Sequence, residues 1–369
     1  MRTEFDVIVI GGGAMGTAAA RVLAERGRST LLLERFEIGH SRGSSRGPTR
    51  IFRLAHLDER DVRMAQLALE GWRELEDRAG ERLLIPVAGL DIGQGLDEIA
   101  AALGSNGVPA TRTSGAAANE RWPALRLPSG LEVLTQEDAG VIMAARVLRA
   151  QTRLASQAGA TIAPNRPVER LRADGFGVEV DTPEATYHST IAVLAAGPWM
   201  SRLLEQAGHP LPLTPTLEQV TYFELEEPSP LPVIVDRTTD RLRSVYSVPN
   251  PELPGSFKVA LHHAGPTVDP DARSFDPDPE RVDAVTSYAG ERFGPHRATG
   301  VTETCLYTNT PDLGFVLDRR GPLVIGSACS GHGFKFTPLI GRILADLATA
   351  QPAPMPIERF LSDRASLGD

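Results

Sequence analysis

The sequence lacks the features that mark several protein classes. It has only two cysteines, Cys305 and Cys329, in 369 residues, which excludes a disulfide framework. Its apolar runs are all much shorter than the ~20 residues needed to cross a bilayer. Basic residues are outnumbered, 38 to 47, and the net charge is −9, so we expect neither nucleic acid nor an anionic membrane as a partner. A small molecule is the expected ligand.

Lysine is also scarce. Only two of the 38 basic residues are lysines, Lys258 and Lys335, and all the others are arginines. A chain that uses arginine almost everywhere is expected to keep lysine where a compact ammonium group does what a broad guanidinium cannot.

The ends of the chain carry no recognisable targeting signal. MRTEFDVIVIGGG includes two acids and is typical of a strand, not of a signal peptide. The last residues, ASLGD, do not match a peroxisomal signal. The expected location is therefore the cytoplasm.

A dinucleotide fingerprint follows the first strand. The run DVIVI predicts a buried parallel strand that leads directly into GGGAMG and an alanine-rich helix. Gly11, Gly13 and Gly16 have the Gly-x-Gly-x-x-Gly spacing, and Glu34 follows 21 residues beyond Gly13 at the end of a second apolar strand. The glycines permit a tight turn and close approach of a pyrophosphate, and the acid can bind ribose hydroxyls. The fingerprint does not separate NAD from FAD.

Two later stretches, STIAVLAAGPWM and GPLVIGSACSGHGFKFTPLIGRILADLATA, repeat the pattern of a strand that enters a glycine-rich turn. In the second we expect Thr337 as the helix N-cap and Pro338 as the first helical residue. Alternating strand-like runs fill the segments between. The predicted fold is α/β, or α+β overall, with a Rossmann-like nucleotide-binding domain of discontinuous segments and a substrate domain built on a mainly antiparallel sheet. The expected segments are 1–82, 140–213 and 305–369 for the first domain, and 83–139 and 214–304 for the second.

Six blocks of sequence, in order along nearly the whole chain, resemble one family. They are GGGAMG at 11–16, GSSRGPTRIFR at 43–53, AAGPW at 195–199, FKVALHH at 257–263, TCLYTNTPDLGFVLD at 304–318 and SGHGFKFTP at 330–338. The chain resembles the monomeric sarcosine oxidase and N-methyltryptophan oxidase family, which are D-amino-acid-oxidase-like flavoproteins. The resemblance implies FAD as the cofactor, attached through its 8α carbon to the sulfur of Cys305, in a monomeric enzyme.

The reaction that the resemblance implies is oxidation of a secondary amino acid, N-methyl or cyclic. A hydride passes to flavin N5, the imine product is hydrolysed, and O2 is reduced to H2O2. The sequence leaves open whether the substrate is sarcosine, a larger N-methyl amino acid, proline or pipecolate. Two alternatives also stay open: a flavin dehydrogenase with another electron acceptor, and a nucleotide-binding regulatory protein without turnover.

The resemblance also implies roles for individual residues. Lys258 would activate oxygen, since an ammonium can stabilise the charge that develops there. Arg53 and Lys335 would bind the substrate carboxylate. Arg50, in the same motif as Arg53, would lie against the flavin. Cys329 is expected to be an ordinary buried thiol.

Aromatic residues complete the expected substrate pocket. Tyr246 and Tyr307 would border the substrate. Strand alternation places His262 on the same face as Lys258 and turns His263 away. No metal site is expected. The expected cofactor contacts are Gly11, Gly13, Ala14, Met15, Gly16, Glu34, Arg35, Ser44, Thr49, Arg50, Val168, Ala196, Gly197, Trp199, Cys305, Gly331, His332, Gly333 and Lys335, and the expected catalytic residues are Lys258, Arg50, His262 and Tyr307.

Overall fold

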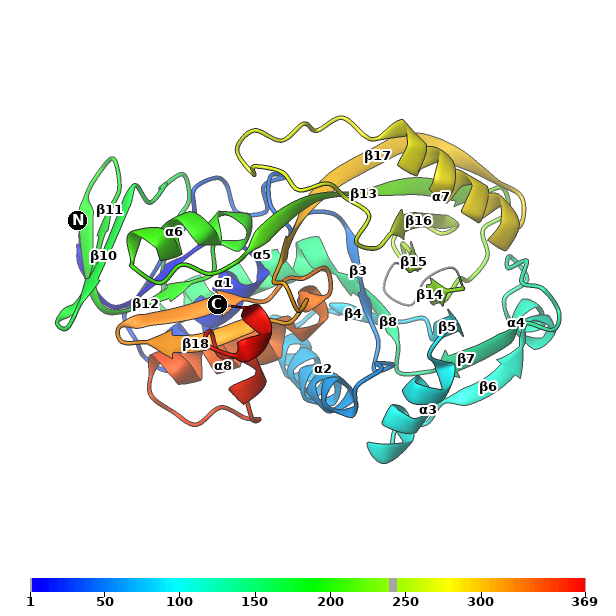
Figure 1. Cartoon of the computed structure of the whole chain (residues 1–369), viewed down its shortest axis with the longest axis horizontal. Helices are drawn as coiled ribbons and strands as arrows, with labels where there is room; N and C mark the ends of the chain where they lie inside the picture. Colours follow the sequence, from blue (N-terminus) through cyan, green and yellow to red (C-terminus); the bar gives the residue numbers. More distant parts are fainter. Residues whose placement is uncertain (1, 239–243, 369) are drawn as a thin grey trace.

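A computed structural model describes residues 2–238 and 244–368, whose strands form two eight-stranded sheets and one three-stranded sheet (Figure 1). The fold class expected from the sequence is confirmed. The chain crosses repeatedly between the two large sheets, so each is assembled from segments distant in sequence.

The first large sheet is mainly parallel and holds the N-terminal strand at its centre. Its strands, in spatial order, are β10 (Arg170–Asp174), β11 (Gly177–Asp181), β12 (Thr186–Leu194), β1 (Glu4–Ile10), β2 (Thr30–Leu33) and β9 (Thr161–Ala163), with β18 (Val316–Arg320) and β19 (Leu323–Ser327) joined at β12. Strand β1 pairs in parallel with both β2 and β12. Its apolar run is buried on both faces, as expected for a central parallel strand.

Helices cover this sheet closely. Helices α1 (Ala14–Glu25), α5 (Ala144–Gln157), α6 (Met200–Gln206) and α8 (Thr337–Ala348) contact its strands, and α2 (Glu59–Ala79) packs on α5 and α8. Helix α1 is rich in alanine, and a side chain at Gly341 of α8 would come within 2.4 Å of the Ala18 Cβ atom. Small residues on both helices therefore permit their close packing, which fixes the glycine turn before α1.

The second large sheet is antiparallel except where β14 meets β5. Its strands, in spatial order, are β17 (His296–Asn309), β13 (Thr214–Leu225), β16 (Ser256–Leu261), β15 (Val245–Pro249), β14 (Val233–Arg237), β5 (Gly89–Gly93), β7 (Glu132–Gln136) and β6 (Thr111–Ser114). Helices α3 (Leu96–Ser105), α4 (Gly115–Arg121) and α7 (Pro279–Arg292) pack on it. The mainly antiparallel second sheet thus agrees with expectation.

A small sheet links the two large ones. It contains β3 (Thr49–Phe52), β8 (Gly140–Met143) and β4 (Leu84–Pro86). Strand β3 contacts α5 on one side and β15 on the other. It therefore presents its residues where the two sheets meet. Strand β17 runs through residue 305, where a domain boundary was expected, and the division into segments stays a prediction.

One expectation about helix α8 is wrong by one residue. The helix begins at Thr337, not at Pro338, because the preceding residues 333–336 form a turn of 3-10 helix. The Thr337 hydroxyl donates to the carbonyl oxygen of Phe334 within that turn and does not cap α8. Among the described helices, none has the length and apolar composition that a membrane span requires.

Candidate active site

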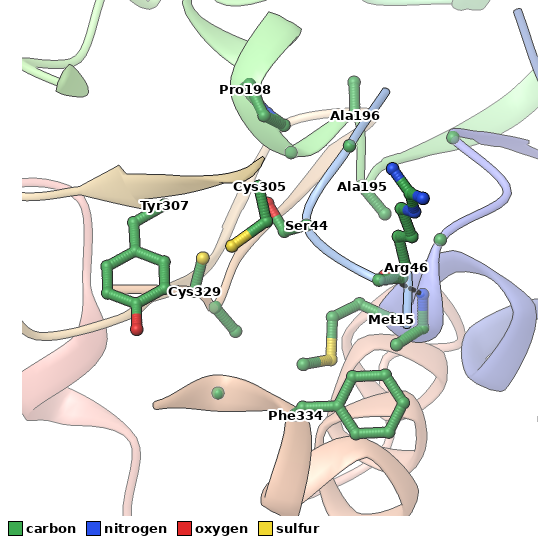
Figure 2. A pocket seen from close by; sticks show the side chains of 18 of the residues that line it. Met15, Ser44, Arg46, Ala195, Ala196, Pro198, Cys305, Tyr307, Cys329 and Phe334 are labelled. Carbon is green, nitrogen blue, oxygen red and sulfur yellow. Dashed lines mark hydrogen bonds between the residues drawn. The ribbon is translucent and has the colours of Figure 1, made fainter. Parts of the chain in front are cut away.

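One large cavity, about 550 Å³, lies where the sheets meet. That volume is in the range of cofactor and substrate sites. The glycine turn after β1 lines one end, and side chains from β13, β15, β16 and β17 line the other. Figure 2 shows Met15, Cys305, Cys329, Tyr307 and Phe334 around the space between.

The glycine turn is built for close approach of a ligand. Gly11 has a φ of +108°, and a Cβ atom there would lie 2.4 Å from the carbonyl oxygen of Ala195. A Cβ atom on Gly16 would lie 1.8 Å from the carbonyl oxygen of Gly11. Side chains are therefore excluded at both positions. The backbone N–H of Gly12 donates to the Glu34 carboxylate at 2.6 Å, which ties the turn to the end of β2.

A segment between β16 and α7, residues 264–278, closes the nucleotide end of the cavity; we call it the strap. In Figure 1 it is the yellow loop that leaves the second sheet. Its Asp271 accepts hydrogen bonds from Trp199 Nε1 and Arg35 Nη1, both at 2.7 Å, and pairs with Arg202. All four residues line the cavity. The strap was not expected at the site.

Two thiols share the middle of the cavity. Cys305 comes from β17, and Cys329 follows β19; both line the cavity as free cysteines (Figure 2). Burial raises the pKa of the Cys305 thiol, although Arg50 acts in the opposite direction. Cys329 accepts a 3.4 Å hydrogen bond from the Thr308 backbone N–H. Cys329 is therefore part of the cavity wall, contrary to the expectation of an ordinary buried thiol.

Lys258 and Arg50 meet at one backbone oxygen. Lys258 is only 4% exposed, and its Nζ donates a 2.7 Å hydrogen bond to the carbonyl of Thr49. Arg50 Nη1 donates to the same oxygen at 2.8 Å. Burial, and next the nearby Arg50 charge, lower the pKa of Lys258 to about 7. Thr49 itself does not line the cavity, and it contributes this oxygen from behind.

A second group of basic side chains lies in and behind the cavity wall and consists of Arg53, Arg237 and Lys335. Asp91 accepts a 2.7 Å hydrogen bond from Arg237 Nη1, and Arg53 Nη1 lies 3.7 Å from the same carboxylate oxygen. Burial lowers the pKa of Arg53 to about 10, so the guanidinium stays charged at neutral pH. Lys335 Nζ donates to the carbonyl oxygen of His332 at 2.6 Å, and burial lowers its pKa well below the ordinary value.

Aromatic and imidazole rings form the adjoining wall. His262 Nδ1 lies 3.3 Å from the Tyr307 hydroxyl, and the rings of Tyr246 and His262 meet edge to face at 6.3 Å. Burial lowers the pKa of His262 well below its usual value and that of His332 to about 3, so both imidazoles are neutral at neutral pH. His262 lines the cavity and His263 does not, in line with expectation, although β16 ends at Leu261 and the two rings stay in contact. Their centroids lie 4.0 Å apart.

The cavity brings together nearly all the residues expected at the site. Gly16 and Thr49 are the exceptions, and both support lining residues from behind. The roles expected of all these residues stay predictions. Several lining residues were missed, and four of them bear polar groups that matter below: Arg46, Tyr222, Asp271 and Glu303. Of these four, Glu303 had a signal in the sequence, because it lies two positions before Cys305 and strand alternation turns both to one face.

The cavity fits FAD. Gly11 to Ala14 form a cradle that side chains would fill, and the N-terminal backbone amides of α1 attract a phosphate group. Glu34 stands where ribose hydroxyls would be bound, and cations line the far end. Within the described ranges, no three His, Cys, Asp or Glu side chains are grouped to hold a metal ion.

Comparisons with known proteins agree with this fit. The model of the FAD dependent oxidoreductase family matches residues 6–347. Peroxisomal sarcosine oxidase of Mus musculus is 34% identical, over 97% of each chain. Monomeric sarcosine oxidase of Bacillus sp. (strain NS-129) is 31% identical, over 100% of this chain and 98% of that one. The structure of NikD, an unusual amino acid oxidase, superposes with a TM-score of 0.89 at 29% identity, covering 99% of this chain and 98% of that one. The chain therefore belongs to the FAD dependent oxidoreductase family.

Proposed function

We propose that the protein is an FAD-dependent oxidase of secondary amino acids, N-methyl or cyclic, that reduces O2 to H2O2. The observation that carries this proposal is the excess of buried positive charge at one end of the cavity. Arg53, which lines the cavity, shares the carboxylate of Asp91 with Arg237 behind the wall, and Lys335 adds a further basic group to the lining. Buried charge without a partner is costly, so this end of the cavity favours an anion.

A substrate carboxylate would supply that anion. Arg53 can offer a fork of N–H donors, and its Nη1 has no hydrogen-bond acceptor among the described residues. Lys335 offers a compact ammonium beside it, and a bound carboxylate would favour that protonated form. Binding there would direct the rest of the substrate toward the wall of Tyr246, His262 and Tyr307. Neutral imidazole and phenol groups suit an uncharged amine, the form that gives up a hydride.

The covalent link belongs to the same proposal. Cys305 would carry the flavin as an 8α-S-cysteinyl thioether. When bound, the flavin supplies the hydride acceptor and passes the electrons to oxygen. The chain would bind the substrate through Arg53 and Lys335 and hold Lys258 as a cation beside the reacting oxygen.

A monomer in the cytoplasm completes the proposal. The Bacillus relative is named a monomeric sarcosine oxidase, which supports the first part. The mouse relative is named peroxisomal, so location differs among relatives.

An anaerobic bleaching screen tests the proposal. The flavin spectrum would be followed under nitrogen with sarcosine, larger N-methyl amino acids, proline and pipecolate, each beside the matching amine without a carboxylate. Bleaching by at least one amino acid, with its matching amine far less effective, is expected. Absence of bleaching by all of them would refute the proposal. Bleaching without peroxide in air would identify a dehydrogenase that uses another acceptor.

A further inference from the structure

A chain of polar contacts runs from Lys258 to a carboxylate. Lys258 and Arg50 both bind the carbonyl oxygen of Thr49. Arg50 also binds the carbonyl oxygen of Arg46. The Arg46 side chain then extends to Glu303, where Nη2 donates to Oε1 at 2.8 Å.

Glu303 is also linked to Lys258 through the second sheet. Its Oε2 accepts a 2.8 Å hydrogen bond from the Tyr222 hydroxyl. Tyr222 is the direct partner of Lys258 in the pairing of β13 with β16. Glu303, Tyr222 and Lys258 all line the cavity. The contacts thus form a ring that contains both the ammonium and the carboxylate.

The elements packed around Lys258 present few charges to it. Strand β3 contributes Arg50, a like charge, and β17 contributes Cys305 and Glu303. On the neighbouring strands the register partners are Tyr222 of β13 and Val248 of β15. Of these groups, only a Cys305 thiolate and the Glu303 carboxylate favour the protonated form of Lys258.

Cys305 contributes little of that support. Its buried thiol has a raised pKa and is uncharged at neutral pH. A thioether at Cys305 would carry no charge at any pH. Among the charged groups that act on Lys258 in the described part of the chain, Glu303 then remains as the counter-charge.

We propose that Glu303 is a positioning residue that keeps Lys258 protonated beside the cofactor, held for this task by Arg46 and Tyr222. The inference rests on the proposed function, in which the Lys258 ammonium stabilises charge on oxygen. A residue 45 positions away in sequence would thereby set the pH range of the oxygen reaction.

The scarcity of lysine makes a direct test possible. Protein labelled with ¹³C at the lysine ε-carbon and purified with its flavin should give two side-chain signals, assigned with Lys258→Met and Lys335→Met. We expect Glu303→Gln to lower the titration midpoint of Lys258 by about one pH unit, because an opposite charge is lost. The Lys335 signal should not move.

Glu224→Gln is the matched control. Glu224 lies on β13 of the same sheet, is partly exposed and pairs with Arg297. It should leave the Lys258 midpoint in place. An unmoved midpoint in Glu303→Gln, or an equal shift in both variants, would overturn the inference. If Glu303→Gln does not fold, Tyr222→Phe carries the test: it removes a neutral hydroxyl that holds the Glu303 carboxylate, and the Lys258 midpoint must then fall.

The two proposals can fail separately. Slow reoxidation in Lys258→Met together with an unmoved midpoint in Glu303→Gln would reject the role of Glu303 and leave the oxidase proposal intact. A lowered midpoint with normal reoxidation in Lys258→Met would support the coupling and reject the oxygen role of Lys258.

Discussion

Arg53 is only partly neutralised by Asp91, because the same carboxylate oxygen accepts the shorter contact from Arg237. The distances are 3.7 Å for Arg53 and 2.7 Å for Arg237. Asp91 therefore holds Arg53 in place without using all of its N–H donors, and the guanidinium can bind a second anion.

Replacing Arg53 should weaken carboxylate binding. Arg53→Gln removes a charged donor from a buried site, and we expect substrate or carboxylate inhibitors to bind about 10- to 100-fold less tightly, roughly 1.5 to 3 kcal/mol. Titration of the flavin spectrum with an unreactive carboxylate measures this directly. Arg73→Gln, at an exposed position of α2, is the control. Equal affinity in both variants would contradict the assignment of Arg53.

Cys305→Ser should abolish acid-stable flavin, because a serine hydroxyl is a far weaker nucleophile than a thiol. The measurement is flavin absorbance in acid-precipitated protein and fluorescence of the band in a denaturing gel. Cys329→Ser serves as the comparison, since it alters the other cavity thiol. Retained flavin in Cys305→Ser, or its loss only in Cys329→Ser, would contradict the proposed attachment.

The oxygen reaction should depend on pH through Lys258. Its pKa is lowered from 10.5 to about 7, so the ammonium is lost as the pH rises through that value, and the reoxidation rate should fall in the same direction. Rapid mixing of reduced enzyme with oxygen measures it. Lys258→Met should be slowed by about 100-fold or more at all pH values. Lys258→Arg should hold its rate at alkaline pH; a decline like that of the wild type would point to another group.

The strap should retain the cofactor. In a Cys305→Ser background, where flavin would be held without a covalent bond, Asp271→Asn should raise the FAD dissociation constant about fivefold, on the order of 1 kcal/mol for a partly exposed ion-pair network. Equilibrium dialysis measures it. Asp276→Asn is matched, since that residue lies in the same strap and bonds Ser274. A similar rise in the FAD dissociation constant in both variants would show that the effect comes from the strap in general and not from Asp271.

Local patterns were the part of this molecule that could be predicted from sequence. The strand, glycine turn and helix around Gly11 depend on residues that are near one another in the chain, and the fingerprint reports them directly. The pair of lysines was conspicuous by composition alone, and both side chains are buried at the cavity. Contacts between distant segments could not be predicted. Arg46 meets Glu303 only because loop 43–47 lies against β17.

Smaller errors have local causes. Alternation did not predict the contact between the rings of His262 and His263, because the strand ends at Leu261 and His263 then adopts a φ of +55°. The predicted start of α8 is wrong because the residues before the helix form a 3-10 turn that contains Lys335. Trp72 Nε1 fixes that turn with a 2.7 Å hydrogen bond to the carbonyl oxygen of Lys335. Such adjustments come from packing between elements, which a single sequence does not display.

The position of Cys305 has a mechanical consequence. It belongs to β17 of the antiparallel sheet, whereas the glycine cradle belongs to the parallel one. A flavin bound covalently at Cys305 and non-covalently at the Gly11 turn would connect the two sheets through the cofactor. Because only the link to Cys305 would be covalent, the cofactor would connect the two sheets in the native fold, and on unfolding it would stay on Cys305 but no longer join the two segments.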